Sequence, residues 1–179
     1  MSDDIATPSQ TVGPFFHFGM TTDQTLGSLD GPAGDRLHLH VRVVDGAGMP
    51  LPDAMIEIYQ ANGAGDYGAA DFTGFGRLAS GADGSCLFET IRPGRVTDAH
   101  GRAQAAHINV CLFARGLLRQ IYTRVYFAGD PDLDADPILA LVPADRRATL
   151  LASPVPGTTG RWAWTIHLQG PDETVFFDL

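Results

Sequence analysis

The chain has 179 residues, of which 44% are hydrophobic, so we expect one domain with a real core, or one domain and a short arm. Its formal net charge of −9, from 12 basic and 21 acidic residues, argues against nucleic acid and anionic membranes as partners. Charged residues are only 18% of the chain, against roughly 25% in ordinary soluble domains. This low charge favours a surface that is partly buried against partner chains.

The first 35 residues are loop-like, with prolines and glycines spread through them. We predict that residues 1–35 form an extended N-terminal arm laid over this subunit or a neighbour, and that residues 36–179 form the folded domain. The N-terminus is acidic and has no apolar signal region, and no apolar run approaches about 18 residues. We therefore expect a cytoplasmic protein.

Residues 37–44 show the clearest strand pattern, because Leu37, Leu39, Val41 and Val43 alternate with polar residues and share one face. Further strands are predicted at residues 54–60, 86–91, 107–113, 120–127 and 161–168, with a short final one at 173–178. The 21 glycines and 12 prolines fall between these runs as turns. The pattern predicts a mainly β protein, an antiparallel β-sandwich.

One short helix is predicted at residues 144–152. Pro143 precedes it, and Asp145 lies in its first turn, where a carboxylate favours the positive end of the helix dipole.

Three other features each have a structural and a functional interpretation. Cys86 and Cys111 are interpreted as small buried strand residues, and a disulfide has no support from a secretory signal. His38 and His40 share a strand face and suggest either a metal site or a solvated face; no nearby acidic or cysteine cluster supplies further ligands. Residues 129–136 resemble a calcium loop but lack the EF-hand spacing, which favours a surface loop.

Six further segments of the chain form a recognisable series: residues 50–62 (PLPDAMIEIYQAN), 65–67, 75–77, 90–94, 106–110 and 126–130. Together, and in this order, they resemble the intradiol aromatic-ring dioxygenases. Residues 7–16 resemble the arm of members built from α and β chains, and residues 113–116 and 173–178 resemble their α subunit in particular. The resemblance implies a transthyretin-like β-sandwich and an αβ protomer repeated in a larger assembly. It further implies one Fe(III) per β subunit and O2-dependent cleavage of 3,4-dihydroxybenzoate to 3-carboxy-cis,cis-muconate.

The family holds its iron with two tyrosines and two histidines, since Fe(III) is a hard ion that anionic phenolates stabilise. Carried over by resemblance, the first tyrosine matches Tyr67 and the first histidine matches His107. The second tyrosine position holds Val96, and the second histidine position holds Asn109. We therefore predict vestigial ligand positions, no metal and no catalytic residue in this chain, with Fe(III) held by the partner β subunit.

The same alignment places Arg95 and Arg124 beside the vestigial pocket, where positive charge disfavours a metal cation. A self-sufficient catechol dioxygenase is excluded by Val96 and Asn109. A non-catalytic transthyretin-like binding or structural module remains the alternative function.

In the family assembly the α chain supplies part of the wall of the β pocket. The resemblance assigns that wall to Thr11, Gly13, Pro14, Phe15 and Arg115. A Gly-Pro pair gives rigid backbone with little bulk, and an arginine places a cation near a substrate carboxylate. The alternatives are an ordinary turn and an ordinary surface arginine.

Overall fold

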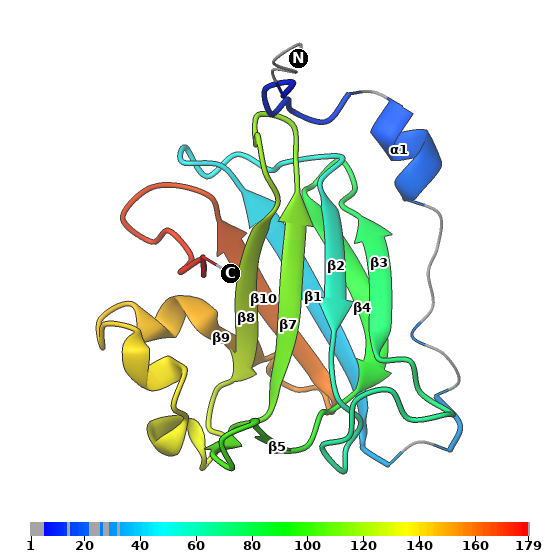
Figure 1. Ribbon diagram of the computed structural model, residues 1–179, viewed down its shortest axis with the longest axis vertical. Coiled ribbons are helices and arrows are strands. Elements are labelled where there is room, and N and C mark those ends of the chain that lie inside the picture. The colour runs from blue at the N-terminus through cyan, green and yellow to red at the C-terminus, as the bar shows by residue number, and fades with distance from the viewer. Residues whose placement is uncertain (1–5, 14, 22–25, 27–28, 32, 179) are drawn as a thin grey trace, which may run out of the picture.

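The computed structural model describes residues 6–13, 15–21, 26, 29–31 and 33–178, and these form a two-layered β-sandwich (Figure 1). The strands are β1 Arg36–Val44, β2 Met55–Tyr59, β3 Phe75–Ala79, β4 Ser85–Ile91, β5 Val96–Thr97, β6 Ala103–Gln104, β7 His107–Phe113, β8 Ile121–Phe127, β9 Leu151–Pro154 and β10 Arg161–His167. The helical segments are α1 Phe15–Met20 and the 3-10 turns η1 Leu133–Ala135, η2 Leu139–Leu141 and η3 Arg147–Leu150.

The strand order is β3-β2-β7-β8-β9-β10-β1-β4, and the separate pair β5-β6 lies below the start of β7 (Figure 1). We call β3, β2, β7 and β8 sheet A, and β10, β1 and β4 sheet B. Strand β9 pairs with β8 in parallel and with β10 in antiparallel, so it joins the layers along one edge.

The core lies between the sheets because their strands alternate. On β1, Leu37, Leu39, Val41 and Val43 are all buried, as the pattern predicted. Each such side chain contributes roughly 1.5–3 kcal/mol when it is fully buried. On β7 the even-numbered residues enter the same core, so its odd-numbered residues, from His107 to Phe113, face outward.

The β-sandwich prediction is confirmed, with several differences in detail. The predicted helix at residues 144–152 is wrong: η3 is a single 3-10 turn, and the chain continues as β9 from Leu151. Pairing of β9 with both layers outweighs the local helix signals. Strand pairs β1–β10 and β8–β9 are parallel, which alternation alone cannot distinguish from antiparallel pairing.

The two ends of the chain also differ from expectation. The arm contains α1, which the loop-like composition did not predict. The tail forms only a single bridge, between Tyr122 and Phe177, in place of a full strand. In the part of the chain that the structure describes, no helix has the length and apolar character needed to cross a membrane. The division into an arm of residues 1–35 and a domain of 36–179 stays a prediction.

Candidate functional site

The loop after β2 positions Tyr67. The side chain of Asn62 accepts hydrogen bonds from the backbone N–H groups of Ala64 and Asp66, at 2.9 and 3.0 Å. Gly65 has a φ of +90°, and a Cβ there would overlap the carbonyl oxygen of Arg95. A glycine is therefore required where this loop crosses the segment before β5, and the crossing places Tyr67 beside sheet A.

Asn109 makes the direct contact with Tyr67. Its side-chain amide donates to the Tyr67 hydroxyl at 3.0 Å and to the backbone carbonyl of Tyr59 at 3.2 Å. The rings of Tyr59 and Tyr67 also pack together, with centroids 5.1 Å apart. Both amide protons of Asn109 are thus donated to these tyrosines. A histidine that bound a metal could not donate two hydrogen bonds in this way.

His107 is buried, with only 1% of its surface exposed. Its Nδ1 lies 2.8 Å from the carbonyl oxygen of Ala105, a distance at which Nδ1–H donates to that oxygen. Burial, and after it the positive charge of Arg124, lower the pKa of His107 to about 4. His107 is therefore neutral at pH 7 and serves as a packed, hydrogen-bonded side chain.

Arg124 brings a permanent positive charge into this group. It is the direct cross-strand partner of Asn109, and it donates to the side chain of Gln104 at 2.9 Å. Burial raises the pKa of Tyr67, whereas the hydrogen bond from Asn109 and the charge of Arg124 partly offset that rise. The phenol is therefore protonated at pH 7, and a guanidinium lies near both Tyr67 and His107.

The residues present do not fit Fe(III). Val96 lies half-buried on β5 opposite Gln104 and offers no ligand atom. Tyr67 is a neutral phenol engaged with Asn109, and the charge of Arg124 would repel a trivalent ion. Among the described residues no three His, Cys, Asp or Glu side chains gather into a metal-binding group. Arg95, expected at the same pocket, instead pairs with Asp132 at 3.1 Å.

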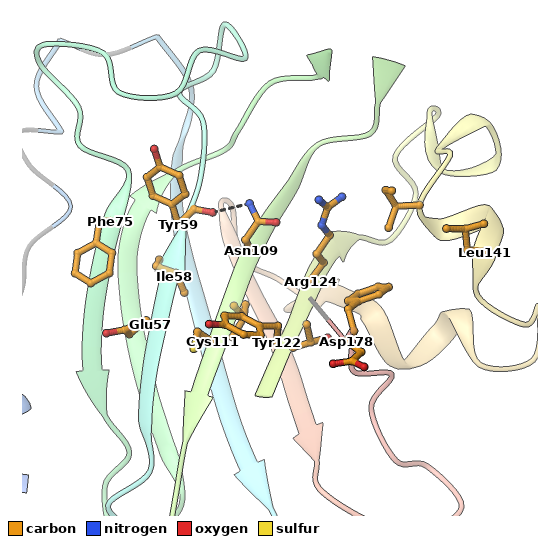
Figure 2. A pocket seen from close by; sticks show the side chains of 14 residues that line it. Glu57, Ile58, Tyr59, Phe75, Asn109, Cys111, Tyr122, Arg124, Leu141 and Asp178 are labelled. Atoms are coloured by element: carbon orange, nitrogen blue, oxygen red, sulfur yellow. Dashed lines mark hydrogen bonds between the residues drawn. The ribbon is translucent and has the colours of Figure 1, made fainter. Parts of the chain in front are cut away.

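A groove of about 560 Å³ opens beside these residues on the outer face of sheet A (Figure 2). Its lining is mainly apolar and aromatic. It includes Asn109 and Arg124, which together with Tyr67 and His107 we call the vestigial group. Sequence reasoning did not predict this groove. The alternation of β7 and β8 indicates which of their side chains face outward. It does not indicate that η2, a later segment of the chain, closes one side of the groove.

The predicted pocket-wall residues gather at the other end of β7. Arg115 is exposed in the turn after Phe113, and the next residue, Gly116, donates its N–H to the Thr11 hydroxyl at 2.7 Å. Phe16 packs on Phe113 with ring centroids 5.9 Å apart. The arm is thereby attached to the β7–β8 hairpin.

Phe15 is 85% exposed next to this attachment. Gly13 is also exposed, whereas Pro14 lies outside the described residues. Strand β7 has seven residues, so at about 3.3 Å per residue its two ends are roughly 20 Å apart. The predicted wall residues are therefore too far from His107 to line this chain's own vestigial group, and their roles stay predictions.

The remaining candidates have structural partners. His38 lies 3.9 Å from Glu89 across β1 and β4, and His40 is exposed, which fits a solvated sheet face. In the acidic loop, Asp130 pairs with Arg92 at 2.8 Å. Asp136 is fully buried and accepts hydrogen bonds from the backbone N–H groups of Ala105, Ile138 and Leu139 and from the Tyr126 hydroxyl.

Both cysteines are free and half-buried rather than fully buried. Burial raises the pKa of each thiol to about 12, so neither is ionised at pH 7.

Comparisons with known proteins agree with the geometry. The dioxygenase family model Dioxygenase_C matches residues 12–170. The chain is 42% identical to the protocatechuate 3,4-dioxygenase alpha chain of Burkholderia cepacia, over 97% of each chain. It is 32% identical to the beta chain from the same organism, over 80% of this chain and 68% of that one.

A solved structure has the same fold. The dioxygenase domain of a carbohydrate-binding fusion protein from Streptomyces sp. SirexAA-E superposes with a TM-score of 0.67 and 27% identity, over 92% of this chain and 98% of that one. With the family model covering most of the chain and relatives of this similarity, the chain belongs to the intradiol dioxygenase family.

Proposed function

We propose that this chain is the α subunit of a two-subunit intradiol dioxygenase that cleaves 3,4-dihydroxybenzoate with O2 to 3-carboxy-cis,cis-muconate. In the proposed enzyme a β subunit holds Fe(III), which supplies the activation of the bound catechol toward O2. This chain binds no iron; it shapes the wall of the β pocket and holds a larger αβ assembly together. The name of its 42% identical relative, a protocatechuate 3,4-dioxygenase alpha chain, supports the substrate and the subunit role.

The observation that carries this proposal is the state of the vestigial group. Asn109 donates to Tyr67, and Arg124 holds a positive charge beside both Tyr67 and His107. A family member with a guanidinium beside these positions, and with Val96 and Asn109 in place of two ligands, needs a second chain for its metal chemistry. A relative at 32% identity is named as the beta chain of the same kind of enzyme, which supports a two-chain enzyme.

The arm end of β7 supports the second part of the proposal. The bond between Gly116 and Thr11 attaches the arm beside Arg115, and Phe15 is exposed there. A substrate carboxylate is repelled by a chain of net charge −9, so a local cation is needed at the pocket. In this proposal Arg115 supplies it, and Gly13 and Phe15 supply the backbone and apolar surface of the wall; Pro14, assigned to the same wall by resemblance, lies outside the described residues.

Co-expression with a β chain that has all four iron ligands tests the proposal. The two chains should purify together in equal amounts, with one iron per αβ pair, and should consume O2 with 3,4-dihydroxybenzoate. This chain expressed by itself should be inactive. A β chain that forms no complex with it, or that is equally active and stable without it, would overturn the proposal.

A further inference from the structure

The groove on sheet A is large enough to hold a small organic molecule. Its volume of about 560 Å³ lies within the roughly 300–1,000 Å³ of ordinary ligand sites. It runs along the outward faces of β2, β7 and β8 and is bordered by the η2 segment (Figure 2). Figure 2 shows Arg124 between Asn109 on one side and Leu141 on the other.

The walls of the groove suit an aromatic ring. Tyr59 and Phe75 line one side, Tyr122 lies on its floor, and Leu141 lines the opposite side. Tyr59 and Leu141 are 43% and 78% exposed, so a ligand between them would remove apolar surface from water. Aromatic pairs add about 0.5–1.5 kcal/mol beyond the area that they bury.

The charges of the groove select an anion. Glu57 is neutralised by Arg77, with Arg77 Nε and one terminal nitrogen at 2.7 and 2.5 Å from the same carboxylate oxygen. Asp178 is exposed at the end away from Asn109. Arg124 is held in place by the neutral side chain of Gln104, and no carboxylate of the described residues lies within 4.0 Å of its guanidinium. Among the residues that the structure describes, the groove thus contains a cation, Arg124, without an anion paired to it.

We infer that this groove is a metal-free binding site for a small aromatic carboxylate, with the carboxylate on Arg124 and the ring against the apolar and aromatic lining beside it. Because the neighbouring residues do not fit Fe(III), we expect the ligand to be bound without being transformed. The inference does not rest on the proposed function, because every residue of the groove belongs to this chain.

Equilibrium dialysis with 4-hydroxybenzoate tests the site, since this probe lacks the second hydroxyl needed for ring cleavage. The protein is the complex of the full chain with its iron-bearing partner. Dialysis counts all bound probe, whereas the ferric tyrosinate absorption reports only the probe at the iron. We expect two equivalents of bound probe per αβ pair, of which one changes the absorption and one does not. We call the second the silent site. The neutral analogue 4-hydroxybenzamide should not occupy the silent site.

Two variants and one control make the result specific. Arg124→Gln should weaken the silent site at least tenfold and leave the iron-linked equivalent unchanged. Leu141→Trp, at an exposed position, should fill the groove with the same result and no loss of folding. Arg42→Gln, an exposed arginine on sheet B, should change neither equivalent.

A single equivalent in the unmodified complex, or a silent equivalent that survives both groove variants, would overturn the inference. If the partner forms no complex, the proposed function fails, and dialysis of this chain by itself should still give one equivalent that Arg124→Gln removes.

Discussion

The two ends of β7 carry opposite kinds of surface. At the His107 end the polar side chains bond within this chain: His107 bonds to Ala105, Asn109 bonds to Tyr59 and Tyr67, and Arg124 bonds to Gln104. At the Phe113 end the arm leaves Phe15, Leu118 and Arg115 exposed. The first end stabilises this chain, and the second has the exposed apolar surface and free cation of an interface. If these are the former ligand positions, as we propose, hydrogen bonds now hold the side chains that a metal would otherwise hold.

The largest contrast between the two ends concerns iron. This chain purified by itself should be colourless and contain no stoichiometric iron, because Val96 and Asn109 supply no phenolate or imidazole. Metal analysis and the visible spectrum measure this. One iron per chain with a red-brown colour would contradict it.

A series of variants separates the effect of the missing ligands on iron binding from the effect of the charge of Arg124. Restoring the ligands by Val96→Tyr with Asn109→His should still give little iron while Arg124 remains. Adding Arg124→Gln should raise the iron content, since it removes the repulsive cation. Equal iron in the double and triple variants would show that Arg124 does not oppose the metal.

The next largest effect concerns association at the arm end. Low charge content and exposed Phe15 and Leu118 suggest a large interface of the obligate kind, which buries over about 2,000 Å². Without its β partner the chain should self-associate or precipitate, as sedimentation velocity would show. Phe15→Ser with Leu118→Ser should improve its solubility, whereas Leu87→Ser on sheet B should not. A stable monomer with a high Tm would count against this interface.

Acid should destabilise the His107 end. The folded pKa of about 4 lies below the ordinary value of 6.5, so between these values the unfolded state binds the proton and the folded state does not. Arg124 disfavours the charged imidazole there and Asp136 favours it, but burial dominates. As the pH falls from 6.5 to 4, the free energy of unfolding should drop by up to roughly 3 kcal/mol.

Urea unfolding at several pH values measures this loss. His107→Gln should be less stable at pH 7 but should have a flatter pH dependence, most visibly between pH 6.5 and 5, above the titration of ordinary carboxylates. His100→Gln, at an exposed histidine, should keep the slope of the unmodified protein. Equal slopes in both variants would mean that His107 is not the group that titrates.

Arg115→Ala should weaken substrate binding at the arm end. A charge-assisted hydrogen bond contributes about 1.5–3 kcal/mol, and a water-screened contact contributes less. In the αβ assembly we expect the KM for 3,4-dihydroxybenzoate to rise several-fold to about a hundredfold, since about 1.4 kcal/mol is tenfold. Iron content should not change, and activity on catechol, which has no carboxylate, should fall much less.

Arg119→Ala, exposed on the same connection, is the matched control and should have little effect. An equal loss on both substrates would assign Arg115 to the fold or the interface. No loss on either would remove it from the site.

The smallest effect is expected at the arm attachment. Thr11→Val removes the acceptor for the N–H of Gly116, a bond worth about 1 kcal/mol. Protease cleavage of the arm should become a few-fold faster and the KM should rise by a similar factor, whereas Thr11→Ser should restore both. Unchanged cleavage would mean that the Phe16–Phe113 contact alone attaches the arm.

Local patterns predicted a large part of this molecule. Alternation located β1, β7 and β8 to within a residue, because one face of each strand is buried and the period is two. The family resemblance matched His107 and Asn109 to two ligand positions, and the alternation along β7 places both on its outward face. Arg124 was placed near them by resemblance, and the pairing of β7 with β8 makes it the neighbour of Asn109.

The sequence by itself determined the β-sandwich and the family, and it predicted that Val96 and Asn109 replace two iron ligands, because each depends on residue identity or on a short-range period. Only the tertiary structure decided that β9 replaces the predicted helix, that Arg95 pairs with Asp132, and that η2 closes a groove over Arg124. The tertiary structure alone also showed that the vestigial group and the arm lie at opposite ends of β7. These features arise from contacts between segments far apart in the chain, and local propensity carries no information about which distant segments meet.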